Sequence, residues 1–174
     1  VVMGRDVTVT YLAQAPDFAE NDSILEYVLR GKNDATEAEA KKILTKLGIN
    51  DFDADINTLS GGQKKRIALA KTLVSPAEVL ILDEPTNHLD SDMVMWLEQF
   101  IKGFKGELLV VTHDRYFLDN VTNRIVELDK GKLYSYDTNY SGFLELKTQR
   151  EEDLRSTEAK RANILRRELE WIKR

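Results

Sequence analysis

Short apolar runs and helical repeats alternate along this chain, and the alternation predicts its elements. Residues 79–82 (Val-Leu-Ile-Leu) and 108–111 (Leu-Leu-Val-Val) are unbroken apolar runs, which are typical of parallel strands buried on both faces. Residues 93–104 between them have helical spacing, and Gly106 follows. Strand, helix and strand in this order form a βαβ unit, so the sequence predicts an α/β fold with a parallel sheet.

Before this unit, the sequence predicts one further strand and three helices. Residues 8–12 are mostly β-branched or aromatic, as in a strand. A third helix is predicted over residues 64–73, after a polar, Asp-rich loop at 50–58. The first two helices are expected to start at capping boxes, in which Glu follows a Ser or Thr by three positions: Ser23 with Glu26, and Thr36 with Glu39.

The C-terminal part predicts a hairpin and a long helix. Residues 124–127 and 133–136 have strand composition and are joined through Lys130-Gly131. Ser141 is a candidate N-cap for an amphipathic helix that runs to residue 174. The apolar residues that follow it at spacings compatible with one stripe are Leu154, Ala162, Leu165, Leu169 and Ile172.

The amino-acid composition excludes several kinds of catalytic and metal-binding site. The 174 residues include no Cys and two His, which excludes disulfides, thiol nucleophiles and cysteine metal sites. The net charge is −5, yet residues 147–174 carry nine basic and six acidic side chains, so this last segment alone is basic. No apolar run is long enough to cross a bilayer and no signal-peptide pattern opens the chain, so we expect a soluble, cytoplasmic protein without membrane contact.

Polar residues follow both apolar strands. Asp83 and Glu84 come directly after the first strand, and Thr112-His113-Asp114 after the second. Ligands of parallel α/β sheets bind beyond the carboxyl ends of the strands, so Asp83, Glu84 and His113 are expected at one edge. Asp83 suits Mg²⁺, Glu84 suits the orientation or deprotonation of a water, and His113 suits a hydrogen bond to an anionic oxygen. The same residues also fit simple helix caps at strand ends, and the pattern alone leaves both interpretations open.

A second candidate is the corner Ser60-Gly61-Gly62, just before the helix predicted over residues 64–73. Glycine lets the backbone approach a ligand, and a helix N-terminus offers free N–H groups, so the corner is an anion site in principle. A Ser-Gly-Gly turn is also a common flexible entry to a helix, and the turn by itself favours that interpretation.

Taken together and in order, five segments resemble the motifs of ATP-binding-cassette (ABC) ATPases. Residues 59–63 (Leu-Ser-Gly-Gly-Gln) resemble the signature motif, and residues 79–84 the Walker B strand with its glutamate. Residues 87–90 are similar to the D-loop, His113 to the switch histidine and Gln14 to the Q-loop glutamine. The resemblance implies a P-loop NTPase-like ABC ATPase domain, in which a parallel sheet core carries a helical subdomain.

Two segments resemble the ABC-F branch of this family, and its Uup-type members in particular. They are residues 83–90 (Asp-Glu-Pro-Thr-Asn-His-Leu-Asp) and 112–118 (Thr-His-Asp-Arg-Tyr-Phe-Leu). ABC-F proteins are soluble, carry two ABC domains in one chain, and many act on the ribosome in translation. The resemblance implies such a role here. A nucleotide-binding subunit of an ABC transporter and a DNA-associated ABC ATPase are the alternatives.

The resemblance also implies a role in ATP hydrolysis for each motif residue. Asp83 and Gln14 would hold Mg²⁺. Glu84 would polarise the attacking water, and His113 would contact the γ-phosphate. Asp90 would communicate between two ATP sites. The signature residues would reach the nucleotide held by a second ABC domain of the same protein, arranged head-to-tail: Ser60, Gly61, Gly62 and Gln63.

The Walker A pattern GxxxxGK[ST], which wraps the phosphates, is absent from the 174 residues. In the family it precedes the Q-loop, so the resemblance implies an N-terminally truncated domain. Residues 1–140 are expected to form a partial nucleotide-binding domain with a helical subdomain at about 20–75, and residues 141–174 the start of the interdomain linker. Without the phosphate loop, this chain alone is expected to be inactive and to bind ATP–Mg²⁺ weakly.

The basic residues of the predicted linker helix suggest two hypotheses. They would begin an arm that approaches RNA phosphates, with DNA as a further option for Uup-type relatives. Alternatively, the segment is a solvated face of a coiled coil, because six acidic residues are interleaved with the basic ones. The mixed charge favours this second interpretation, since it weakens the attraction to phosphates.

Overall fold

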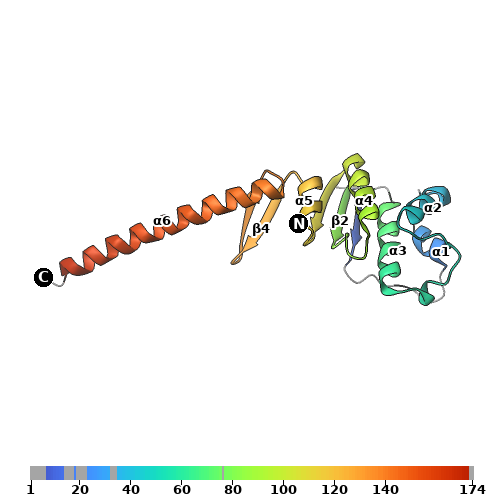
Figure 1. Ribbon diagram of the computed structural model, residues 1–174, viewed down its shortest axis with the longest axis horizontal. Helices are drawn as coiled ribbons and strands as arrows, with labels where there is room; N and C mark the ends of the chain where they lie inside the picture. The colour runs from blue at the N-terminus through green and yellow to red at the C-terminus, as the bar shows by residue number, and fades with distance from the viewer. Residues whose placement is uncertain (1–6, 14–17, 19–22, 32–34, 76, 173–174) are drawn as a thin grey trace. The chain divides into compact units, whose positions relative to one another are not determined.

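The computed structural model describes residues 7–13, 18, 23–31, 35–75 and 77–172 (Figure 1). Its internal contacts divide the chain into two compact units, Val1–Phe117 and Leu118–Arg174. The division falls within a short helix, Arg115–Val121 (α5). The boundary at residues 140 and 141 that the sequence motifs suggested stays a prediction. Within the described ranges, no helix combines the length and apolarity that a bilayer crossing requires.

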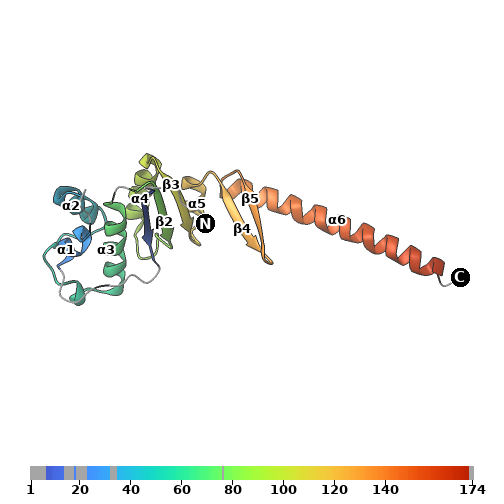
Figure 2. The same cartoon turned by 180° about the vertical axis from the view of Figure 1, so that it is seen from behind.

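The first unit is built on a three-stranded parallel sheet. Its strands are Val9–Leu12 (β1), Val79–Asp83 (β2) and Glu107–Val111 (β3), in the order β1-β2-β3 (Figure 2). The register pairs Asp83, the last residue of β2, with Val111, the last residue of β3. The carboxyl ends of β2 and β3 therefore meet at one edge, and the predicted α/β class is confirmed.

Helices connect and follow these strands. Three lie between β1 and β2: Ile24–Leu29 (α1), Glu37–Lys46 (α2) and Gly61–Leu73 (α3); Ser91–Gly103 (α4) connects β2 to β3, and α5 follows β3. Helices α1, α2 and α3 contact one another, and α3 also contacts β1. Both predicted capping boxes are present at Ser23 and Thr36. The predicted loop at 50–58 contains a short 3-10 turn, Ile56–Thr58, and α5 had no counterpart among the predicted elements.

Only one face of the sheet is buried. Leu80 and Leu82 are at most 2% exposed, because they point to the face that also buries Leu12. On the opposite face, Leu109 and Val111 are each more than half exposed. The expectation that the second apolar run is buried on both faces is therefore wrong: in β3, Leu109 and Val111 lie on the exposed face of the sheet, and Leu108 and Val110 on the opposite face are half-buried.

The second unit contains the predicted hairpin and the predicted long helix. Ile125–Asp129 (β4) pairs antiparallel with Lys132–Tyr136 (β5), and Tyr140–Ile172 (α6) follows. Lys130 and Gly131 both have positive φ, as a two-residue type I′ hairpin turn requires. From residue 151 to residue 167 every side chain of α6 is exposed, so within this unit the apolar stripe of the helix is unpacked.

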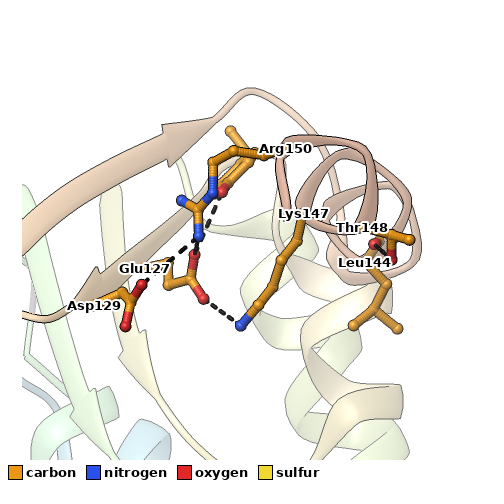
Figure 3. Close-up of polar contacts among 7 residues, drawn as sticks. Glu127, Asp129, Leu144, Lys147, Thr148 and Arg150 are labelled. Carbon is orange, nitrogen blue, oxygen red and sulfur yellow. Dashed lines mark hydrogen bonds and ion pairs between the residues drawn. The ribbon is translucent and has the colours of Figure 1, made fainter. Parts of the chain in front are cut away.

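A charged cluster fastens the hairpin to the first turns of α6 (Figure 3). The Glu127 carboxylate, 12% exposed, accepts hydrogen bonds from Lys147, from Arg150 Nη2 at 2.9 Å and from the Tyr136 hydroxyl at 3.3 Å. The Arg150 guanidinium also lies 3.8 Å from the centre of the Tyr134 ring. Burial raises the pKa of Glu127, but the Lys147 hydrogen bond and the two positive charges outweigh it, so this pKa lies below its ordinary value.

Candidate functional site

The edge where β2 and β3 end is shaped by an unusual backbone. Glu84, the first residue after β2, has φ of 49°, and its N–H donates to the Val111 carbonyl at 2.7 Å. A glutamate in the left-handed region is uncommon and costs about 1 kcal/mol or more, so surrounding contacts must hold it there. This conformation lets the Glu84 side chain reach the loop that follows β3.

The two oxygens of the Glu84 carboxylate have different neighbours. Oε2 accepts a hydrogen bond from the Thr112 hydroxyl at 3.0 Å and a longer one from the His113 backbone N–H at 3.4 Å. Oε1 lies 3.5 Å from Nε2 of the His113 imidazole. The Glu84 side chain is 12% exposed, whereas the His113 side chain is fully exposed. The structure therefore brings Glu84 and His113 together.

The loop that carries Thr112 is itself fixed. The Asp114 N–H donates to the Thr112 hydroxyl oxygen at 3.1 Å, and the Asp114 carboxylate accepts from the Phe117 N–H in the first turn of α5 at 3.0 Å. Sequence reasoning treated Thr112 only as part of the segment Thr-His-Asp and assigned it no role. Its position directly after an apolar strand was the only available signal.

Asp83 occupies the last position of β2 and is partly buried. With Glu84 it lines a narrow recess that also includes Lys65, Arg66 and Asn87. Among the described residues, no three His, Cys, Asp or Glu side chains converge to form a metal cage. A single carboxylate still fits Mg²⁺, because this ion is usually held by one or two carboxylates together with waters and substrate phosphates.

The corner Ser60-Gly61-Gly62 is a capped helix start. The Ser60 hydroxyl accepts from the Gln63 N–H at 3.3 Å, and Gln63 Oε1 accepts from the Ser60 N–H at 3.0 Å. A Cβ added at Gly62 would lie 3.4 Å from the Cβ of His88, so the corner is close to the segment that follows Glu84. Its side-chain hydrogen bonds stay within the corner and do not reach Glu84.

The remaining predicted site residues are Asp90 and Gln14. Asp90 is the N-cap of α4, and its carboxylate accepts from the Met93 N–H at 2.9 Å. His88, two residues earlier, also has a positive φ, of 67°. Gln14 lies outside the described residues.

Comparisons with known proteins agree on one family. A family model described as ABC transporter matches residues 5–87, and a second model with the same description matches residues 126–174. Together the two models cover most of the chain, and the first includes Asp83 and Glu84.

Three curated relatives align with most of this chain. The uncharacterized ABC transporter ATP-binding protein YfmR of Bacillus subtilis is 54% identical over 82% of the chain and 23% of its own length. The energy-dependent translational throttle protein EttA is 41% identical in Escherichia coli K12, over 89% of the chain and 28% of its own length. The Mycobacterium tuberculosis EttA is 44% identical over 79% of the chain and 25% of its own length. The chain thus spans about a quarter of these relatives.

Solved structures show the same fold. The archaeal ribosome recycling factor aABCE1, solved in a complex with the archaeal ribosomal stalk protein aP1, has a TM-score of 0.60 and 29% identity, covering 77% of this chain and 28% of its own. A bacterial Atm1-family ABC exporter with ATP bound has a TM-score of 0.68 at 22% identity, covering 79% and 26%. The two family models show that the chain belongs to the ATP-binding-cassette family, and its similarity to the EttA proteins is consistent with the ABC-F branch that the motifs predicted.

Proposed function

We propose that this chain is part of a longer ABC-F ATPase and contributes the residues that activate water at one of its ATP sites. The observation that carries the proposal is the Glu84 carboxylate. Its Oε2 is held by Thr112 and His113, while Oε1 accepts no hydrogen bond from the described residues and faces an exposed imidazole. Such a carboxylate is suited to accept a hydrogen bond from a water that attacks a phosphate.

The other motif residues take roles around this carboxylate. Asp83, at the adjacent strand end, would hold Mg²⁺ together with Gln14, and His113 would contact the γ-phosphate. Mg²⁺ supplies positive charge to the phosphate oxygens in this class of reaction. The exposed His113 side chain supports its role, because a group that contacts a substrate must be accessible.

The signature corner would act on a second nucleotide. We assign Ser60, Gly61, Gly62 and Gln63 to the ATP held by the second ABC domain, packed head-to-tail against this one, with Asp90 coupling the two sites. Support comes from the length of the relatives, of which the chain spans about a quarter, and from the exposure of Ser60 and Gly61. On the same basis, residues 1–140 belong to the first nucleotide-binding domain and residues 141–174 to the linker.

The biological setting we propose is the ribosome, in the cytoplasm. Two observations favour it: several relatives are named as translational throttle proteins, and the similar archaeal factor recycles ribosomes. ATP-driven closure and release of the two domains would provide the switch. The basic residues of α6 from Arg155 to Arg167 are exposed and available for RNA in this unit, whereas Lys147 and Arg150 pair with Glu127. The interleaved acidic residues also suit a coiled-coil partner.

The test uses the full-length protein that contains this chain. We expect Mg²⁺-dependent ATP hydrolysis and co-sedimentation with ribosomes that requires ATP and weakens with salt. ATP hydrolysis without ribosome association, but with co-purification of membrane proteins, would favour the transporter that the family description suggests. Association with DNA in place of ribosomes would favour the DNA-associated alternative.

A second measurement separates this chain from the complete protein. Because the Walker A pattern is absent from the 174 residues, we expect the isolated chain to bind ATP–Mg²⁺ very weakly. Isothermal titration calorimetry on the isolated chain and on the full-length protein compares the two directly. Micromolar affinity of the isolated chain would contradict the assignment of the phosphate loop to another part of the protein.

A further inference from the structure

The direction of the hydrogen bonds at Thr112 follows from chemistry alone. The Asp114 backbone N–H can only donate, so the Thr112 oxygen accepts from it at 3.1 Å. An ionised carboxylate can only accept, so the single hydroxyl proton of Thr112 points at Glu84 Oε2, 3.0 Å away. The Thr112 hydroxyl therefore accepts one hydrogen bond, from the Asp114 N–H, and donates its proton in another, to Glu84 Oε2.

This arrangement makes the two carboxylate oxygens unequal. Oε2 receives Thr112 and the longer contact from the His113 N–H, both from one loop after β3. Oε1 accepts neither of these bonds and instead lies 3.5 Å from Nε2 of the exposed His113 imidazole. The carboxylate plane is therefore set by the loop, and the Asp114 carboxylate that accepts from Phe117 N–H anchors that loop to the start of α5.

We propose that Thr112 is a positioning residue for ATP hydrolysis: its hydroxyl fixes Glu84 so that Oε1 is presented to the attacking water. The inference rests on the proposed function, because it requires Glu84 to act on water. A glutamate has three rotatable side-chain bonds, so the backbone conformation of Glu84 alone does not fix the orientation of its carboxylate. Without the hydroxyl, Glu84 would keep its place in the chain but lose a fixed carboxylate orientation, which positioned groups need to within fractions of an ångström.

The test measures steady-state ATP hydrolysis by the full-length protein with four substitutions. Thr112→Val removes the hydroxyl at nearly constant volume, Thr112→Ala removes it with less bulk, and Thr112→Ser keeps it. Thr148→Val is the matched control, because the Thr148 hydroxyl donates only to the Leu144 carbonyl within α6, at 2.9 Å. If Thr112→Val unfolds, as judged by its melting temperature, Thr112→Ala carries the test.

We expect Thr112→Val to lower kcat about tenfold or more with little change in KM, since one hydrogen bond to a charged group is lost. Thr112→Ser and Thr148→Val are expected to stay within about twofold of the parent. A purely structural role would not produce this pattern, because a destabilised protein loses active molecules without rescue by serine. Normal kcat in both hydroxyl-free variants, or equal losses in Thr112→Val and Thr112→Ser, would overturn the proposal.

A double-mutant comparison makes the role specific. If Thr112 acts through Glu84, then adding Thr112→Val to Glu84→Gln should cause no further loss of hydrolysis. A further tenfold loss in the double variant would show that Thr112 acts elsewhere. Glu84→Gln alone also separates the two hypotheses: unchanged hydrolysis in that variant would refute the proposed function itself, whereas a Glu84→Gln loss beside a fully active Thr112→Val would refute only the positioning role.

Discussion

Two glutamates of this molecule have the same exposure and opposite surroundings. The Glu84 and Glu127 side chains are both 12% exposed. Glu127 accepts hydrogen bonds from Lys147, Arg150 and the Tyr136 hydroxyl, so two positive charges face one carboxylate. Glu84 accepts from a neutral hydroxyl and a backbone N–H, and its second oxygen faces a solvent-exposed imidazole.

The groups that surround each carboxylate decide whether it stabilises the fold or stays able to act on a water. Cations that neutralise Glu127 also occupy its lone pairs, which suits a joint between a hairpin and a helix. Neutral donors orient Glu84 without cancelling its charge, which leaves it able to polarise a water. The type of residue and its burial are the same, so the difference lies in the donors.

The largest expected effect comes from Glu84→Gln, which keeps the shape but removes the charge. We expect hydrolysis by the full-length protein to fall by about 10²–10⁴-fold, the usual contribution of a positioned general base. ATP binding should persist, because the carboxylate acts on water and not on the nucleotide. The measurement is turnover together with nucleotide affinity.

The same change at the other glutamate should act on stability instead. Glu127→Gln leaves Lys147 and Arg150 without their carboxylate, and we expect a loss of about 2–3 kcal/mol of unfolding free energy in the second unit. Denaturant unfolding followed by circular dichroism measures it. The comparison breaks down if Glu127→Gln abolishes turnover of the folded protein as strongly as Glu84→Gln does.

Substitution of a glycine tests the packing of β2 and β3, the strands that support the Glu84 site but not the Glu127 cluster. A Cβ at Gly106, just before β3, would overlap the Glu78 carbonyl oxygen, so Gly106→Ala must shift backbone and is expected to cost about 1–3 kcal/mol. Gly103→Ala is the matched control, since a Cβ there meets nothing within 4 Å. Equal melting temperatures for the two variants would contradict the close packing of β2 against the start of β3.

Acid should weaken the Glu127 cluster by a smaller amount. The pKa of Glu127 is lower in the folded chain than its ordinary value, so its stabilisation is complete above the unfolded value of about 4.3 and is lost as pH falls through the folded value. We expect part of the stability difference between the parent and Glu127→Gln to be lost on acidification. The melting temperatures of the two proteins should move closer together between pH 6 and about pH 3; a constant gap would exclude this carboxylate as the cause.

Local signals were enough to predict most elements. The capping boxes at Ser23 and Thr36, the run 79–82 and the turn at Lys130-Gly131 each act over a few residues, so they are legible in the sequence. An apolar run shows that both faces of a strand are apolar but not that both are covered, which is why the exposure of Leu109 was not predicted.

The arrangement of the site was predicted only in part. The proximity of Glu84 and His113 follows from strand order, because adjacent parallel strands end together. The contact between Thr112 and Glu84 depends on the left-handed backbone at Glu84 and on side-chain torsions, and neither has a periodic signature. The seven-residue helix α5 was missed for a similar reason: it is too short to show a repeat.

The most direct test is a structure of the full-length protein with an ATP analogue and Mg²⁺ bound. We expect a water hydrogen-bonded to Glu84 Oε1 and in line with the γ-phosphorus, while Oε2 keeps its bond to the Thr112 hydroxyl. A closed, nucleotide-bound structure in which another side chain holds that water, and the Glu84 carboxylate points away from it, would contradict the role proposed for Glu84.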